Sequence, residues 1–227
     1  AGVILPPPLC ESKDVVDAFV SAGIPVVSIA SSHFGTTVSC VRIDDRRASH
    51  EMVAHLIAQG HARIGYITGD PNQTASEHRW QGYRDALAEG GIPYDALLVQ
   101  PGCFTYRSGL EAAERLLDVL PPPTAIFASN DDMASAVVSV AHRRGLDVPD
   151  DLSVVGFDDT SAATMVWPEL TTIHQPVAEM ADSAMDILLR ATRRSADPAA
   201  PPITQVLPHR LVARASVSPP RGAAAAK

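Results

Sequence analysis

The sequence predicts an α/β fold built on mainly parallel sheets, and three observations support this prediction. Short apolar segments alternate with longer segments in which apolar residues recur at helical spacing. Most of the short segments are apolar and β-branched throughout, as strands are when helices cover both faces of a sheet. Three helical segments end at a glycine that a proline soon follows, at Gly23, Gly91 and Gly145. Glycine takes the left-handed conformation after a helix and proline stops the helix from resuming, so each break separates a helix from the next strand.

The elements are expected in alternating order along most of the chain. Strands are predicted at residues 2–6, 25–30, 38–44, 63–69, 97–100, 125–129 and 153–157, where the apolar runs lie. Helices are predicted at residues 14–22, 48–59, 76–89, 106–120, 132–144 and 177–191, where the spacing is helical. After these come a loop of small residues and proline, two short strand-like segments at 203–207 and 209–217, and a Pro- and Ala-rich end that is expected to be disordered.

Composition excludes several classes of protein. The chain has 227 residues, 46% of them hydrophobic and 19% charged, which is typical of a globular protein with an ample core. Its net charge of −8 argues against direct binding to nucleic acid, which needs a basic surface. No apolar run is long enough to cross a membrane, and no secretion signal is present. The first residues already resemble a buried strand, so we expect the chain to begin in the middle of a domain.

The three cysteines, Cys10, Cys40 and Cys103, are too few and too widely spaced for a disulfide framework or a zinc site. We expect them to be buried or half-buried free thiols in a reducing compartment. The eight histidines show no zinc-protease spacing, and no nucleophile elbow, phosphate-binding loop or dinucleotide fingerprint occurs. The sequence therefore predicts no catalytic residues, no metal site and no cofactor.

Two predicted strands run directly into short polar residues. Asn130, Asp131 and Asp132 follow one of them, and Asp158 and Asp159 follow another. Ligands of open α/β sheets bind beyond the carboxyl ends of the strands, so these residues favour a receptor for a small polar molecule. Neighbouring strand residues point to opposite faces, so a paired-carboxylate catalytic site at Asp158 and Asp159 is disfavoured. The alternative at Asn130 or Asp131 is that one of them only caps the following helix.

Two further residues have both a structural and a functional interpretation. Arg79 lies in the first turns of a predicted helix. Taken alone, it would be interpreted as a solvated arginine. The functional alternative is that its guanidinium donates forked hydrogen bonds to a carboxylate or to vicinal hydroxyls of a ligand. Phe104 follows a predicted strand and would be either a core residue or a ring that stacks on a ligand.

Five segments together resemble a known family. They are GHARIGYI at 60–67, RWQGY at 79–83, SNDDMA at 129–134, VPDDLSVVGFDD at 148–159 and LTTIHQP at 170–176. In order and spacing they are similar to the effector-binding domain of the lactose/galactose repressor (LacI/GalR) family of transcriptional regulators, across nearly the whole chain up to about Val217. The resemblance implies a two-lobed, type I periplasmic-binding-protein-like fold with a sugar or nucleobase held between the lobes.

Domain boundaries and site residues follow from the same resemblance. It implies an incomplete first lobe at residues 1–44 and 177–207, a second lobe at 45–176 and 208–217, and a disordered tail at 218–227. The chain would cross between the lobes near Asp44, Gln175 and Pro208. The polar effector contacts would be Arg79, Asn130, Asp158 and Gln175, and Phe104 would flank the effector.

The resemblance also has departures. Family members begin with a helix-turn-helix and two further strand–helix units, which this chain lacks, so DNA contact is expected only through that missing N-terminal part. Ala30 stands where some sugar-binding members carry an acid, which leaves the effector open. The expected protein is a cytoplasmic, homodimeric, non-enzymatic regulator that senses a small molecule. The rival interpretation is a periplasmic sugar-binding protein of a transporter, which shares the fold.

Overall fold

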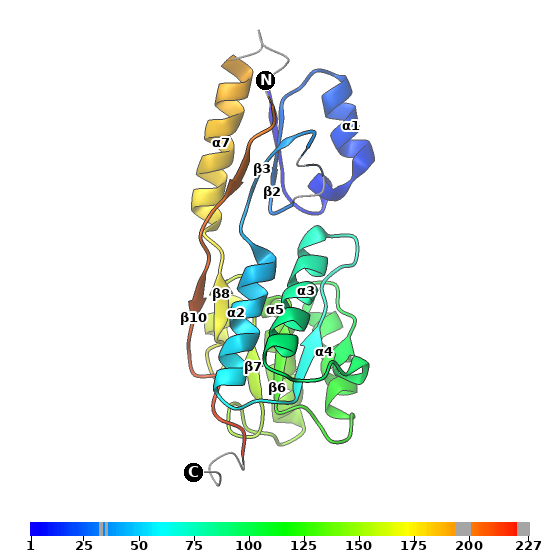
Figure 1. Cartoon of the computed structure of the whole chain (residues 1–227), viewed down its shortest axis with the longest axis vertical. Helices are drawn as coiled ribbons and strands as arrows, with labels where there is room; N and C mark the ends of the chain where they lie inside the picture. The colour runs from blue at the N-terminus through cyan, green and yellow to red at the C-terminus, as the bar shows by residue number, and fades with distance from the viewer. Residues whose placement is uncertain (32–33, 35, 194–200, 222–227) are drawn as a thin grey trace. The chain divides into compact units, whose positions relative to one another are not determined.

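The computed structural model describes residues 1–31, 34, 36–193 and 201–221, and it confirms the predicted α/β fold with mainly parallel sheets (Figure 1). The chain divides into two compact units. Unit 1 consists of Ala1–Asp44, Asn72–Ala75 and Gln175–His209, and unit 2 consists of Asp45–Pro71, Ser76–His174 and Arg210–Lys227.

Unit 1 is built on a four-stranded sheet in the order β1-β2-β3-β9, in which all neighbours are parallel. Its strands are β1 (Val3–Leu5), β2 (Val26–Ile29), β3 (Ser39–Arg42) and β9 (Thr204–Val206). Helices α1 (Lys13–Ser21) and α7 (Val177–Arg193) lie on opposite sides of this sheet, and a short 3-10 helix, η1 (Leu9–Glu11), precedes α1 (Figure 1). Two-sided covering explains why β1 and β2 consist mostly of apolar residues.

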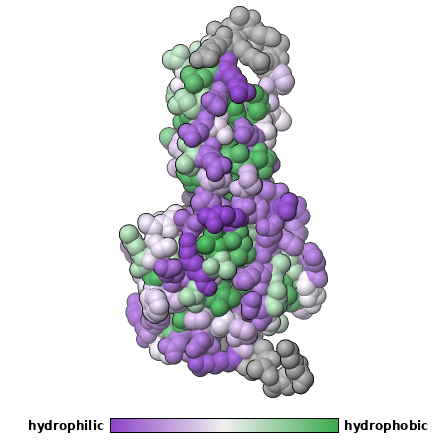
Figure 2. Space-filling model, turned by 90° about the vertical axis from the view of Figure 1, so that its left-hand side faces the viewer, coloured by the Kyte–Doolittle hydropathy of each residue, from purple (hydrophilic) through white to green (hydrophobic). Residues whose placement is uncertain are grey.

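The outer face of α7 keeps apolar side chains in solvent. Val177, Met185 and Leu189 are exposed, and they follow one another at multiples of four residues. Figure 2 shows the face on which α7 lies, and hydrophobic residues are interspersed there with hydrophilic ones. Scattered exposure of this kind is normal for a protein surface.

Unit 2 is built on a parallel four-stranded sheet in the order β5-β4-β6-β7. The strands are β4 (Ile64–Ile67), β5 (Val99–Gln100), β6 (Ala125–Ala128) and β7 (Ser153–Val155), and a separate antiparallel pair is formed by β8 (Thr172–His174) and β10 (Arg210–Val212). The helices are α2 (Asp45–Ala58), α3 (Thr74–Glu89, in this unit from Ser76), η2 (Ala96–Leu98), α4 (Tyr106–Leu117), α5 (Asp131–Arg143) and α6 (Ala162–Met165). The strand order reverses between β4 and β6, which makes that point the topological switch of the sheet.

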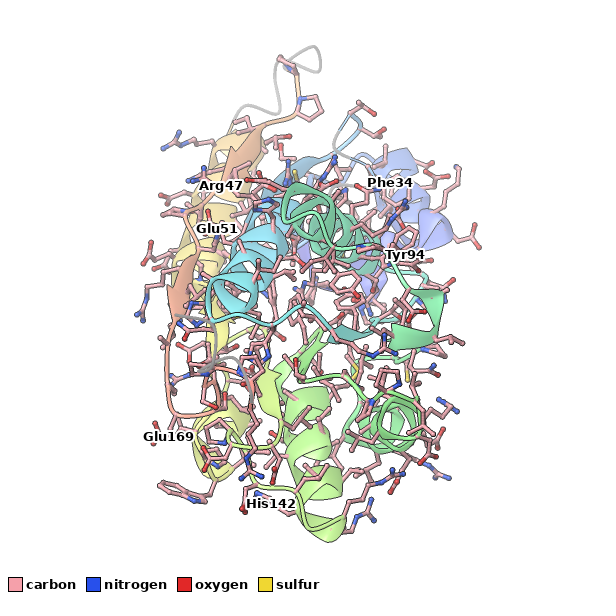
Figure 3. All side chains as sticks on the ribbon, turned by 60° about the horizontal axis from the view of Figure 1, so that its bottom comes forward. Phe34, Arg47, Glu51, Tyr94, His142 and Glu169 are labelled. Atoms are coloured by element: carbon pink, nitrogen blue, oxygen red, sulfur yellow. The ribbon has the colours of Figure 1, made fainter. Side chains whose placement is uncertain are left out.

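One hydrophobic cluster of unit 2 lies between its sheet and the pair α4 and α5. Buried aliphatic side chains from β4, β6 and β7 pack there against Leu116 and Val137. The outer faces of the helices are charged instead: Arg47 and Glu51 form an ion pair one turn apart on α2, and His142 lies in the last turn of α5 (Figure 3). This division into apolar and polar faces is what the helical spacing in the sequence predicts.

Three local expectations are corrected by the structure. Strand β8 and helix α6 were not predicted, because both are too short to show a period. Cys103 is exposed, while Cys10 and Cys40 are buried. The first residues of the tail expected from Ser218 onward instead make defined contacts, because Ser218 hydrogen-bonds Ser153 and Pro149, and Arg221 pairs with Asp151. Residues 222–227 of that expected tail lie outside the described residues.

No helix among the described residues is long and apolar enough to cross a membrane.

Candidate functional site

The candidate site lies beyond the carboxyl ends of the parallel strands of unit 2. Gly69 follows β4, Asn130 follows β6 and Asp158 follows β7, and β4 and β6 flank the switch point of the sheet. Arg79 reaches the same place from the second turn of α3, where it lies within 3.4 Å of Asp158. The structure thus brings Arg79, Asn130 and Asp158, which are distant in sequence, to one edge of one sheet, where open α/β folds bind ligands.

Arg79 is not the solvated arginine that its position in a helix suggests. Its side chain is only 5% exposed, and its Nε donates a hydrogen bond to Asp45 Oδ1 at 2.8 Å. Its Nη1 donates to the Ser129 carbonyl at 2.5 Å and lies 3.4 Å from Asp158 Oδ1. Burial alone would lower the pKa of Arg79, but the charges of Asp45 and Asp158 outweigh burial and raise it. The guanidinium therefore remains charged at the base of the site.

Asp45 is one of the residues that the sequence analysis missed. It is the first residue of α2, and its side chain is 6% exposed. An acid at a helix start is usually interpreted as a favourable partner of the helix dipole, so the sequence pattern contains no sign of the pairing with Arg79. The pairing depends on the close approach of α2 to α3. Ser49 Oγ donates to the Arg79 carbonyl at 2.6 Å, and a Cβ on Gly82 would lie 2.1 Å from the Arg46 carbonyl.

Two aromatic rings lie close to the guanidinium of Arg79. Its Cζ lies 3.6 Å from the ring centre of Phe157 and 5.7 Å from that of Phe104. Phe157 is fully buried and was not predicted as a site residue. Phe104 is half-buried, takes a positive φ of 59° and packs so closely on Gly69 that a Cβ there would lie 2.1 Å from its ring. Phe104 is thus both a support for Arg79 and a ring that remains partly open to solvent.

Asn130 caps helix α5, which starts at Asp131, one residue earlier than predicted. Its Oδ1 accepts a hydrogen bond from the Met133 amide at 3.0 Å, and its Nδ2 donates to the Phe104 carbonyl at 3.0 Å. The amide thus fixes the position of Phe104 as well as the start of the helix. An asparagine amide has two donors and two acceptor lone pairs, so these two bonds do not exhaust it.

Asp131 is structural. Its carboxylate accepts hydrogen bonds from the Thr160 amide at 2.7 Å and from Thr172 Oγ1 at 2.6 Å, which ties the loop after β7 and strand β8 to α5. Burial raises the pKa of Asp131, and the hydrogen bonds from the two threonines oppose that rise.

Asp158 and Asp159 diverge as expected, although neither lies in a strand. Asp158 directs its carboxylate toward Arg79, keeps 26% of its side chain exposed and takes a φ of 108°. Asp159 pairs instead with His174 and Arg214. The fifth predicted site residue, Gln175, is half-buried and belongs to unit 1, directly after the last residue of unit 2 in β8. Asp158 thus combines a place at the carboxyl edge of the sheet with a partly exposed acceptor.

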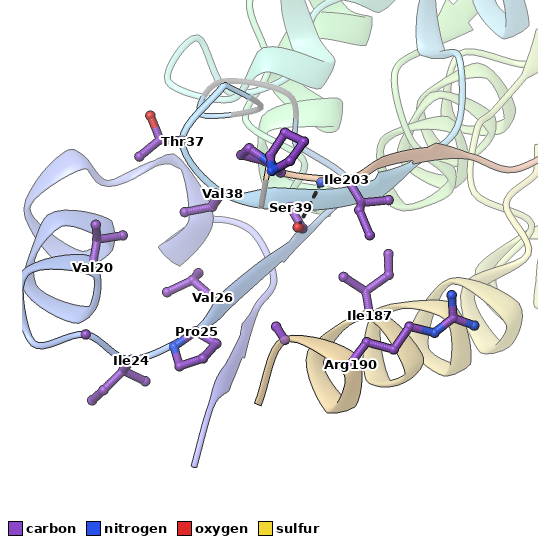
Figure 4. Close-up of a pocket in the computed structure, with 14 residues that line it drawn as sticks. Val20, Ile24, Pro25, Val26, Thr37, Val38, Ser39, Ile187, Arg190 and Ile203 are labelled. Atoms are coloured by element: carbon purple, nitrogen blue, oxygen red, sulfur yellow. Dashed lines mark hydrogen bonds between the residues drawn. The ribbon is translucent and has the colours of Figure 1, made fainter. Parts of the chain in front are cut away.

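A cavity also lies away from this site. It has a volume of about 310 Å³ within unit 1 and is lined by Pro25, Val38, Ile187 and Ile203, among others (Figure 4). Ser39 Oγ accepts a hydrogen bond from the Ile203 amide at 3.0 Å at its rim. Pro25, Val38 and Ile203 directly precede β2, β3 and β9, so the cavity lies at the amino ends of these strands, opposite to the edge at which α/β sheets bind ligands.

No group of three or more His, Cys, Asp or Glu among the described residues could hold a metal ion. The site of unit 2 instead offers the partly exposed carboxylate of Asp158, the buried guanidinium of Arg79 and the aromatic ring of Phe104. Such a set can accept hydrogen bonds from hydroxyl groups while an apolar ring face covers the C–H groups of the same molecule.

Comparison with known proteins agrees with this architecture. Residues 53–217 match the family model described as a periplasmic binding protein-like domain. The chain is 40% identical over 211 residues to the HTH-type transcriptional regulator DegA of Bacillus subtilis, an alignment that covers 92% of this chain and 61% of DegA. The chain thus spans less than two thirds of the length of this relative.

Solved structures of transcriptional regulators share this fold. The complex of the transcriptional regulator CelR with cellobiose superposes with a TM-score of 0.86 and 34% identity, over 95% of this chain and 65% of that one. A LacI family transcriptional regulator from Mycobacterium smegmatis superposes with a TM-score of 0.84 and 30% identity, over 96% of this chain and 79% of that one.

Proposed function

Because this chain belongs to the LacI family of transcriptional regulators and carries its periplasmic binding protein-like domain, we propose that it is the part that senses a small-molecule effector. In the whole protein, occupancy by the effector changes the affinity for an operator. Such coupling is reciprocal, so operator DNA changes the affinity for the effector by the same factor. We propose that a helix-turn-helix makes the DNA contact, since the relative DegA is an HTH-type regulator.

One observation carries the choice of effector class: the partly exposed Asp158 carboxylate beside a buried arginine whose charge is already balanced. Arg79 is paired with Asp45 and lies close to Asp158, so it gains little from a further anion. A carboxylate is an acceptor and repels anions, whereas it accepts hydrogen bonds readily from neutral hydroxyl groups. We therefore favour an uncharged, hydroxyl-rich effector, a sugar or a nucleoside, over a carboxylate or phosphate.

The proposed contacts divide by role. Asp158 accepts hydroxyl hydrogen bonds, Phe104 covers an apolar face of the effector, and Arg79 and Asn130 orient these two residues and contribute direct contacts. Gln175 is proposed as a contact on the grounds of family resemblance, and it lies directly after β8 in the chain. No enzymatic step and no cofactor are needed for this function.

We further propose that the whole protein is a cytoplasmic homodimer. Met165 and Trp167, at and just after α6, are 83% and 78% exposed. Large apolar side chains in solvent support a protein–protein contact. Size-exclusion chromatography with light scattering would show twice the mass of the chain, and the variant Trp167→Glu would return the protein to a monomer. A monomeric wild type at micromolar concentration would contradict the assignment.

A thermal-shift screen tests the effector proposal. The test compounds are cellobiose, glucose, galactose, ribose, adenosine and cytidine, with citrate and phosphate as anionic comparisons. At about a hundred times its Kd a compound stabilises the folded state by about 2.7 kcal/mol. For a chain of this length that corresponds to a rise in Tm of roughly 5–10 °C. Sugars or nucleosides should raise Tm, whereas the anions should not.

Matched variants place the binding at the site. Asp158→Asn should weaken the affinity of a compound that raises Tm by about tenfold or more, because a charged acceptor is replaced by a neutral amide. Asp150→Asn removes an exposed acid elsewhere in unit 2 and should leave the affinity unchanged. Equal affinities for Asp158→Asn and wild type, or stabilisation by the anions alone, would refute the proposed site.

A further inference from the structure

The segment that presents Asp158 is strained. Asp158 and Asp159 have φ values of 108° and 58°, and neither is glycine. Two consecutive L-residues in this region are disfavoured and persist only where the surrounding structure imposes the conformation. Some contact must therefore hold this segment in place.

The carboxylate of Asp159 supplies such a contact at both of its oxygens. Its Oδ1 accepts a hydrogen bond from Arg214 Nη2 at 2.5 Å, and its Oδ2 hydrogen-bonds His174 Nδ1 at 2.9 Å. The side chain of Asp159 is only 12% exposed. Burial acts to raise the pKa of Asp159, but the hydrogen bonds and charges of Arg214 and His174 outweigh burial and lower it. The carboxylate is therefore ionised at neutral pH and can accept a hydrogen bond at each of its two oxygens.

Arg214 is itself anchored. Its backbone amide donates to Thr171 Oγ1 at 2.9 Å, and its Nη1 donates to the Leu170 carbonyl at 2.9 Å. Glu169, labelled in Figure 3, adds a weaker ion pair at 3.8 Å from Arg214 Nε. The guanidinium is thus held on the segment that leads into β8. Asp159 consequently links the segment after β7 to β8 and to the segment that leads into it.

The neighbouring Asp158 has two contacts of its own. Its amide donates to the Ile173 carbonyl at 2.8 Å, and its carboxylate lies 3.4 Å from Arg79 Nη1. Because consecutive residues of this segment point in different directions, holding Asp159 toward β8 leaves Asp158 aimed at Arg79. A released segment would relax toward unstrained φ values and carry the Asp158 carboxylate away.

We propose that Asp159 is a positioning residue for effector recognition: its double contact with Arg214 and His174 holds the strained segment that presents Asp158. This inference rests on the proposed function, since Asp158 is the effector contact in that proposal. Asp159 itself does not touch the effector. It acts through the backbone that it shares with Asp158.

Two measurements on the full chain test the proposal, and the first needs no effector. NMR hydrogen exchange reports the protection of the Asp158 amide, which is bonded to Ile173. Asp159→Asn keeps the shape of the side chain but loses its charge, and should speed this exchange by about tenfold or more. Glu169→Gln alters only the weak outer partner of Arg214 and should change the exchange less than about twofold.

The second measurement is the affinity of the same variants for cellobiose, galactose, ribose and cytidine by calorimetry. For a compound that binds the wild type, Asp159→Asn should weaken binding by about tenfold, while Glu169→Gln has no effect. A purely structural role would lower the urea midpoint and leave the affinity unchanged. Should Asp159→Asn fail to fold, His174→Gln removes only one of the two partners, and an intermediate loss of both protection and affinity is expected.

The outcomes separate the two proposals. Unchanged exchange at Asp158 in a folded Asp159→Asn protein overturns the positioning role, whichever compounds bind. Faster exchange with unchanged affinity also overturns it. If none of the four compounds binds the wild type, the effector class of the proposed function is refuted, and the exchange result alone decides whether Asp159 holds Asp158.

Discussion

Asp45 and Arg79 form a buried ion pair, with Arg79 Nε and Asp45 Oδ1 2.8 Å apart and both side chains almost fully covered. The pair joins the first residue of α2 to the second turn of α3. Arg79 then spans from Asp45 to the end of β6 through the Ser129 carbonyl. The cationic base of the candidate site is therefore also a structural junction of unit 2.

Removing one partner of this pair should be strongly destabilising. Asp45→Asn leaves the buried charge of Arg79 with weaker compensation, which typically costs about 3–5 kcal/mol. Urea unfolding monitored by circular dichroism measures the loss. The exposed pair of Arg46 with Asp85 provides the control, because Asp85→Asn should cost at most about 1 kcal/mol. Similar losses for both variants would show that Arg79 does not depend on Asp45.

Gly69→Ala should disturb the aromatic wall of the site. The added Cβ would lie 2.1 Å from the Phe104 ring and 2.4 Å from Ser76 Oγ, so Phe104 must move. Overpacking of this kind costs about 1–3 kcal/mol. We expect both a lower urea midpoint and weaker binding of any compound that stabilises the wild type. At Gly90, the nearest atom to an added Cβ is the end of the flexible Ile57 side chain, so Gly90→Ala should leave binding unchanged.

Stability should fall as the pH drops below about 6.5, the ordinary histidine pKa. His61 is buried, and burial lowers its pKa in the folded state, as it does for His55. Below the unfolded pKa the unfolded chain binds protons that the folded chain does not, so the stabilising contribution of neutral His61 is fully present above that value and is lost on acidification. His61→Gln should therefore flatten the pH dependence of the free energy of unfolding between about pH 5 and 7. A slope identical to that of the wild type would contradict this assignment.

The three thiols should differ in reactivity. Cys103 is exposed, whereas Cys10 and Cys40 are buried, and burial raises the pKa of Cys10 to about 12. The thiolate is the reactive form, so one thiol per chain should react rapidly with a chromogenic disulfide reagent in the native state, and all three after unfolding. Cys103→Ser should abolish the rapid phase. Rapid reaction of two thiols would show that a buried cysteine becomes accessible.

The order of the elements could be predicted because it depends on local patterns. Apolar runs predicted most strands, helical spacing predicted the longer helices, and Gly23, Gly91 and Gly145 all take the positive φ expected after a helix. The arrival of Asn130 and Asp158 at one edge also follows from local information, because each residue follows a parallel strand of the same sheet. β8 and α6 escaped prediction since a segment of three or four residues shows no period.

Hydrophobic periodicity, helix endings and the polar residues after strands are local features of the sequence. They were enough to predict the α/β fold and to bring Asn130 and Asp158 to the edge at which we propose that a ligand binds. The partners of the charged side chains could not be predicted from these local features. Whether Arg79 would be solvated or buried, and that Asp45 and Asp159 would hold the site together, depended on which distant segments pack against each other. A buried charge needs a counter-charge close to it, and which charged residue lies close enough is decided only when the chain has folded.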